Sequence, residues 1–173
     1  MIDTTTHLLP RFVDLRPGVD RVENQGQEGN CHSHMGTEIL EVLAERAHDK
    51  YPDLIPATGI QLSRHMLEYL ALDLENRIGQ EGVITIDDVM RALWRGCCPE
   101  ILWDFIPSNR FQRPPIECFQ AAQAFRIKDW ISLIAGRSAG DWALAAPTTI
   151  NRMCHALAQG RPLGLAFTVT KDF

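Results

Sequence analysis

Residues 24–34 read NQGQEGNCHSH, and along this stretch a glycine-containing loop changes into a helix at Cys31. Apolar side chains then recur at the spacing of one helix face, while charged side chains fall on the other side. The apolar positions are Met35, Ile39, Leu40 and Leu43, and the charged ones are Glu38, Glu41, Glu45 and Arg46. The pattern predicts a helix over residues 31–48 with Cys31 at its N-terminus.

A cysteine at a helix N-terminus is placed to act as a nucleophile. Free backbone N–H groups and the positive end of the helix dipole favour a negative charge there. They therefore favour the thiolate, which is the reactive form of cysteine. The residue type alone leaves another interpretation open, because a lone cysteine is often a small buried apolar side chain.

The spacing before Cys31 favours the nucleophile. Gln25 lies six residues upstream, with Gly26 and Gly29 between. This pattern, Gln-Gly-x-x-Gly-x-Cys, resembles that of papain-like (C1 family) cysteine peptidases of bacterial type, and residues 13–16 (VDLR) resemble the entry segment of that family. The resemblance implies that Cys31 is the nucleophile and that the Gln25 amide and the Cys31 N–H form an oxyanion hole.

The resemblance also implies a site for a peptide or protein substrate. We expect Gly29 and Asn30, directly before the nucleophile, to contact it. The block from Gly82 to Trp103 resembles the stretch after the second helix of bacterial papain-like peptidases, where a glycine loop lines the substrate cleft. Gly82 is a candidate for that wall, and the alternative is an ordinary turn glycine.

Composition excludes several function classes. The chain of 173 residues is 45% hydrophobic and 23% charged, which is ordinary for a globular protein. A formal net charge of −5 argues against a nucleic-acid partner. The sequence contains neither a classical signal peptide at its start nor a run of about 18 apolar residues that could span a membrane. We expect a cytoplasmic protein, or one exported without a classical signal.

The cysteines predict neither a metal site nor a disulfide framework. Five of them, at positions 31, 97, 98, 118 and 154, form no CxxC pair and no Cys/His cluster at zinc spacing. We therefore expect no metal and no cofactor. An odd count fits reduced thiols. The resemblance also implies that Glu28 occupies a position where many secreted papain-like enzymes carry a disulfide-forming cysteine. The absence of that cysteine favours a reducing compartment.

Further helices are predicted downstream. The second covers about residues 62–77, begins at Gln61 or Ser63, and places Arg64, Glu68 and Asp73 in solvent. His65 is expected to be partly exposed and no ligand. Later helices are predicted over residues 85–96 with Thr85 as cap, over 117–128, and from Thr148 or Thr149 to Gln159, followed by a strand over 163–170. The aromatic residues Trp103, Phe105, Phe111 and Trp130 are expected in the core or at a lobe interface.

The sequence shows no counterpart of the histidine that takes the proton of the thiol in papain-like peptidases. In the family, a histidine and an asparagine follow the strand that residues 163–169 resemble, but no histidine follows His155. His155 itself lies in an earlier helix. His32 stands in place of the usual tryptophan and projects away from Cys31. His34, at i+3, could favour the thiolate as a cation, or could simply pack beneath the helix.

Together these features predict an α+β, papain-like fold of which this sequence is the N-terminal portion. Residues 1–110 would hold the entry segment and helical lobe. Residues 111–173 would hold a connector, a helix and the first strand of an incomplete antiparallel β-barrel lobe. The predicted function is that of a cysteine peptidase or acyl-transfer enzyme whose histidine and asparagine come from a missing segment or a second chain. The alternatives are an inactive papain-like binding module and an enzyme completed in trans.

Overall fold

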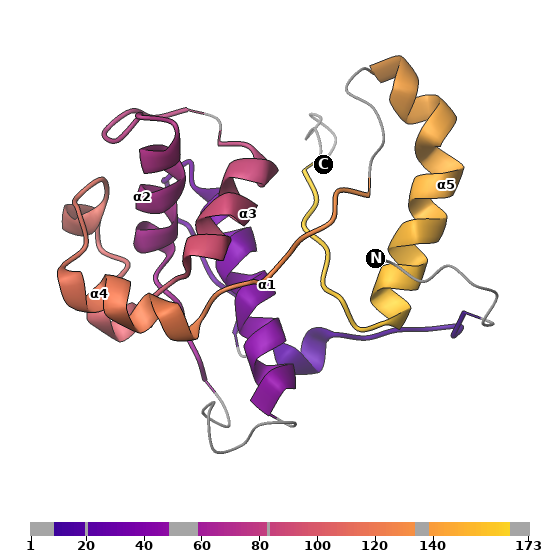
Figure 1. Ribbon diagram of the computed structural model, residues 1–173, viewed down its shortest axis with the longest axis horizontal. Helices are drawn as coiled ribbons and strands as arrows, with labels where there is room; N and C mark the ends of the chain where they lie inside the picture. The colour runs from indigo at the N-terminus through magenta and orange to yellow at the C-terminus, as the bar shows by residue number, and fades with distance from the viewer. Residues whose placement is uncertain (1–8, 20, 49–58, 83, 134–138, 167–173) are drawn as a thin grey trace.

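The computed structural model describes residues 9–19, 21–48, 59–82, 84–133 and 139–166 (Figure 1). The α-helices are α1 (Cys31–His48), α2 (Arg64–Leu74), α3 (Ile86–Arg95), α4 (Ile116–Ala121) and α5 (Ala139–Ala158). Short 3-10 helices are η1 (Arg16–Gly18), η2 (Glu100–Leu102), η3 (Pro107–Asn109) and η4 (Ala122–Ala124). These described ranges contain no β-strand, and an isolated bridge pairs Leu62 with Pro99. The expectation of a mainly helical N-terminal lobe is therefore confirmed.

The core lies where α1, α2 and α3 meet (Figure 1). Gly36 of α1 makes this close approach possible, because a Cβ there would lie 2.6 Å from Val89 and 2.7 Å from Leu67. Cys118 and Ala122 extend the core to α4 and η4. Its fully buried members are Leu62, Met66, Leu67, Ala71, Val89, Ala92, Leu93, Cys97, Cys98 and Cys118.

Local signals in the sequence begin two of these helices. Ser63 caps α2, with its hydroxyl accepting from Met66 N at 3.1 Å. Thr85 and Asp88 form a reciprocal capping box at the start of α3, which confirms the predicted threonine cap. These caps satisfy backbone donors that have no partner inside the helix.

Helix α4 ends earlier than the sequence predicts. The expected helix ran to about residue 128, whereas α4 ends at Ala121 and continues only as η4 to Ala124. The chain after η4 pairs with the end of α3 instead, since Cys97 N donates to Phe125 O at 2.9 Å and Ile127 N donates to Leu93 O at 3.2 Å. These tertiary hydrogen bonds replace further helical ones.

Helix α5 stands apart from the group formed by α1 to α4 (Figure 1). It begins at Ala139, before the predicted start near Thr148. Pro147, a residue that usually stands in the first turn of a helix, therefore lies in its interior. The following segment returns to α1, where a Cβ on Gly164 would lie 2.9 Å from Met35 Sδ. Residues 163–166 form no strand, since no described segment pairs with them, and residues 167–170 of the predicted strand lie outside the described residues. The start of a barrel lobe and the division at residue 110 stay predictions.

The predicted aromatic positions differ in burial. Trp103 and Phe111 pack against the core, and Phe105 contacts two histidine rings. Trp130 is 37% exposed. Among the described helices, none is long and apolar enough to cross a bilayer.

Candidate active site around Cys31

Cys31 is the first residue of α1, as the sequence predicts. Asn30 precedes the helix, and its carbonyl oxygen accepts from Ser33 N at 2.9 Å and from His34 N at 3.3 Å. The thiol of Cys31 is free and the residue is exposed. An accessible thiol therefore lies at the end of the helix where backbone N–H groups have no partner inside the helix.

The loop that carries Gln25 is a tight turn. Gly26 has φ +61°, a conformation that favours glycine, and its N–H donates to Asn24 Oδ1 at 2.8 Å. The N–H of Glu28 donates to Gln25 O at 3.2 Å. The side chain of Gln25 folds back over this turn, and its Nε2 donates to Glu28 O at 2.8 Å. One amide hydrogen thus holds the side chain, which leaves the other for an acceptor from outside.

The candidate substrate-contacting residues differ in exposure. Gly29 is exposed and has open space where a Cβ would stand. Asn30 is fully buried, and its Nδ2 donates to Glu28 at 2.8 Å and contacts Glu68 at 3.5 Å. Gly82 is exposed with φ +152° in the loop between α2 and α3. Substrate contact at these three positions stays a prediction, and the whole of Asn30, backbone included, is buried.

A buried ionic cluster lies directly behind this loop. Glu28 Oε2 lies 2.9 Å from His65 Nε2 and 3.6 Å from Arg110 Nε. Arg110 also pairs with Glu68 at 3.2 Å and with the exposed Glu81 at 2.8 Å. The guanidinium therefore connects the Gln25 loop, α2 and the loop that carries Gly82.

The same cluster has the spacing of metal ligands. One ligand atom from each of Glu28, His65 and Glu68 lies within 4.8 Å of the others. The guanidinium of Arg110 and the Nδ2 of Asn30 already contact both carboxylates, so donors occupy the places that a cation would take. The carboxylates of Glu28 and Glu68 are therefore paired within the protein.

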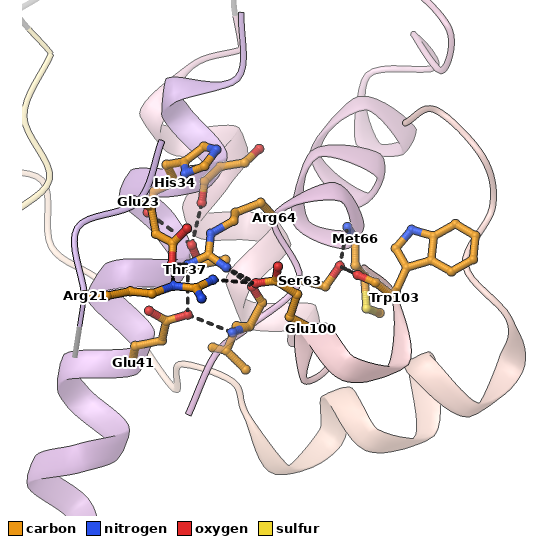
Figure 2. Close-up of polar contacts among 12 residues, drawn as sticks. Arg21, Glu23, His34, Thr37, Glu41, Ser63, Arg64, Met66, Glu100 and Trp103 are labelled. Carbon is orange, nitrogen blue, oxygen red and sulfur yellow. Dashed lines mark hydrogen bonds and ion pairs between the residues drawn. The ribbon is translucent and has the colours of Figure 1, made fainter. Parts of the chain in front are cut away.

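A second buried cluster surrounds Arg64 (Figure 2). Its guanidinium pairs with Glu100, with Glu23 at 2.9 Å and with Glu41 at 3.6 Å. Arg21 joins it through Glu23 and through Glu100, the latter at 3.7 Å. Burial raises the pKa of Glu41 to about 7, although the N–H of Leu62 and the charge of Arg64 oppose this shift. One fully buried arginine thus organises three carboxylates.

Three expectations for α2 are wrong. Arg64, His65 and Glu68 are at most 2% exposed, whereas the sequence placed Arg64 and Glu68 in solvent and His65 partly there. Periodicity assigned charged residues to the outer face. The structure covers that face with charges of opposite sign from the entry segment and from Arg110, which no local pattern predicts. The only local signal was the i, i+4 pair of opposite charges, which is also common on exposed helices.

The histidines near Cys31 are packed and neutral at pH 7. Burial lowers the pKa of His32 to about 4, and Arg110 contributes to this. Burial and the charge of Arg64 lower the pKa of His34 to about 4 as well. The His34 ring meets Phe105 edge-on at 5.1 Å between centroids. Of the two interpretations of His34, packing beneath the helix is the one that the structure supports.

The fold has a solved counterpart. The structure of xylellain, a cysteine protease from Xylella fastidiosa, matches 88% of this chain at a TM-score of 0.64 and 25% sequence identity. The match spans 55% of the xylellain chain, so this chain corresponds to about half of that protein. No protein-family model and no curated protein sequence matches the chain. The structural likeness to a cysteine protease agrees with the resemblance that the Gln25–Cys31 motif carries.

Proposed function

We propose that this chain is the nucleophile-bearing portion of a papain-like cysteine peptidase or acyl-transfer enzyme. The observation that carries the proposal is an exposed thiol at the first residue of α1, preceded by the folded-back Gln25 loop, in a fold that matches a cysteine protease. Cys31 is the nucleophile, and Gln25 together with the Cys31 N–H binds the oxyanion.

The reaction that we propose begins with attack of the Cys31 thiolate on a peptide carbonyl carbon. A C–S bond forms, and the carbonyl oxygen becomes an oxyanion that accepts from Gln25 Nε2 and from the Cys31 N–H. The C–N bond then breaks, the amine leaves with a proton, and a thioester remains. Water releases the acid in a peptidase, whereas an amine takes the acyl group in a transferase.

The base and its asparagine partner come from outside these 173 residues in this proposal, either in the same protein or in a second chain. In support, His32 and His34 are neutral at pH 7 and packed in the helical lobe, and His155 is buried in α5. Gly29 and Gly82, which are both exposed, contact an extended peptide next to Asn30. The proposed setting is a reducing, cytoplasmic one, which would keep the five free thiols reduced.

The test uses the protein together with whatever segment or partner supplies the histidine. A thiol-directed peptidyl electrophile is expected to label Cys31, and Cys31→Ala is expected to abolish peptide turnover. Cys154→Ala, which removes the other exposed thiol, is the matched control and should keep full turnover. Full turnover in Cys31→Ala would contradict the proposal.

A second candidate is a module that binds peptides without cleaving them. The neutral, packed state of both histidines near Cys31 favours it, because neither is placed as a cationic partner of the thiolate. It predicts peptide binding that survives alkylation of Cys31, with no turnover. Copurification with a chain that supplies a histidine and restores turnover would instead support completion in trans.

A further inference from the structure

The loop that carries Gln25 is held on both sides by two adjacent residues of α2. Glu23 lies two residues before Gln25, and its carboxylate lies 2.9 Å from Arg64 Nη2 (Figure 2). Glu28 lies three residues after Gln25, and its carboxylate lies 2.9 Å from His65 Nε2. The first two residues of α2 therefore contact both ends of the Gln25 turn.

The start of α2 is itself fixed. Ser63 caps the helix, and its hydroxyl donates to Trp103 O at 2.7 Å, while Ser63 N donates to Cys98 O at 2.9 Å. Arg64 and His65 are 0% and 1% exposed. A buried polar or charged group is costly without its partner, so moving Glu23 away from Arg64 or Glu28 away from His65 carries a penalty.

The position of Glu28 is coupled directly to Gln25. The Gln25 amide donates to the backbone oxygen of Glu28, and the Glu28 N–H donates back to Gln25 O. Any shift of Glu28 therefore moves the amide of Gln25. A side-chain donor fixed in place before the reaction stabilises a developing oxyanion more than a mobile one does.

We propose that Glu28 and His65 are positioning residues that hold Gln25 as the oxyanion donor. Their hydrogen bond holds the turn against α2, and Arg110 also contacts Glu28 and Glu68. This inference rests on the proposed function, because it requires Gln25 to bind an oxyanion.

The test compares two reactions of Cys31 in the 173-residue chain. Acylation by p-nitrophenyl acetate passes through an oxyanion: the S–C bond forms, the C–O bond to p-nitrophenolate breaks, and the thiol proton goes to solvent. Alkylation by iodoacetamide displaces iodide without an oxyanion. Mass spectrometry of the Cys31 peptide gives both rates, and their ratio cancels changes in thiol exposure.

Glu28→Ala and His65→Ala are each expected to lower the acylation rate by about tenfold or more, with alkylation unchanged within about twofold. Gln25→Ala should give a similar loss. The double variant Gln25→Ala/Glu28→Ala should lose no more than Gln25→Ala alone, because both changes remove the same interaction. Glu75→Ala, which breaks the exposed ion pair between the C-cap residue of α2 and Arg91, is the matched control and should keep the wild-type ratio.

Each possible failure has a distinct meaning. If Gln25→Ala lowers acylation but Glu28→Ala and His65→Ala do not, the positioning role is overturned and the proposed function stands. If Gln25→Ala leaves acylation unchanged, the oxyanion assignment fails, and this inference fails with it. Circular dichroism confirms folding of each variant. Glu28→Met, which keeps the side-chain length but removes both the charge and the hydrogen bond to His65, replaces Glu28→Ala if that variant unfolds, and an unchanged ratio in it would also overturn the inference.

Discussion

At the scale of single residues, the five cysteines fall into two environments. Cys31 and Cys154 are exposed, whereas Cys97, Cys98 and Cys118 are buried in the core. Burial raises the pKa of each of these three thiols, because a thiolate loses its hydration there. The nucleophile candidate is thus one of two thiols that solvent reaches.

We expect iodoacetamide to modify the folded chain at Cys31 and Cys154 and to leave the three core thiols intact. Intact-mass measurement should show two adducts on the native chain and five after denaturation in guanidinium chloride. Modification of Cys97 or Cys98 without denaturation would contradict the burial that the structure shows.

At the scale of secondary structure, α1 depends on a glycine for its contact with α2 and α3. A Cβ on Gly36 would lie 2.6 Å from Val89 Cγ1 and 2.7 Å from Leu67 Cδ2. Valine is stiff at χ1 and has no room to turn away in a close-packed core. The packing of α1, which begins at Cys31, therefore depends on the absence of a side chain at Gly36.

Gly36→Ala should destabilise the protein by about 1–2 kcal/mol, since overpacking outweighs the gain of about 1 kcal/mol in helix propensity. Urea unfolding followed by circular dichroism measures this difference. Val89→Ala removes the clashing methyl groups. The double variant should therefore lose less than the sum of the two single changes. Simple additivity would show that the two helices do not meet at this point.

At the scale of the whole molecule, buried ion pairs join the segment before the Gln25 loop, which carries Glu23, to the helices. Glu41 of α1 accepts from Leu62 N at 2.7 Å and faces Arg64, which also binds Glu23 and Glu100 (Figure 2). The entry segment, α1, α2 and η2 thus share one cluster. Its charge state should set part of the pH dependence of folding.

Glu41 should make the protein less stable as pH rises from about 4.5 to about 7. Burial raises its folded pKa from 4.5 to about 7, so the folded state keeps a proton that the unfolded state has released. The loss is complete above about pH 7 and amounts to at most about 3 kcal/mol. Glu41→Gln keeps an acceptor for Leu62 N and should remove this slope.

Urea unfolding of wild type and Glu41→Gln at pH 5 and pH 8 measures the effect as a difference. His32 and His34 act in the opposite direction, since their lowered pKa values stabilise the fold above pH 6.5 and this contribution is lost as pH falls toward 4. They are common to both proteins, so the difference isolates Glu41. Equal pH dependence of the two proteins would show that the fold does not raise the pKa of Glu41.

Local sequence determined much of the helical lobe. Helix α1 has the predicted bounds, α3 begins at the predicted threonine cap, and the exposed cysteine lies at the predicted helix N-terminus. Such features depend on residues three or four positions apart and on backbone donors in one turn, so the sequence alone carries them. The spacing between Gln25 and Cys31 likewise indicates the candidate site without any knowledge of tertiary contacts.

Tertiary structure alone decided what surrounds that site. It buried Arg64, His65 and Glu68, paired the chain after η4 with the end of α3, and brought Arg110 to Glu28. The two residues of each contact lie more than 20 positions apart in the chain. Sequence periodicity therefore predicts a charged side chain to be exposed, because it does not show which distant residue pairs with it. A buried ion pair depends on where two distant segments meet, and hydrophobic periodicity contains no information about that.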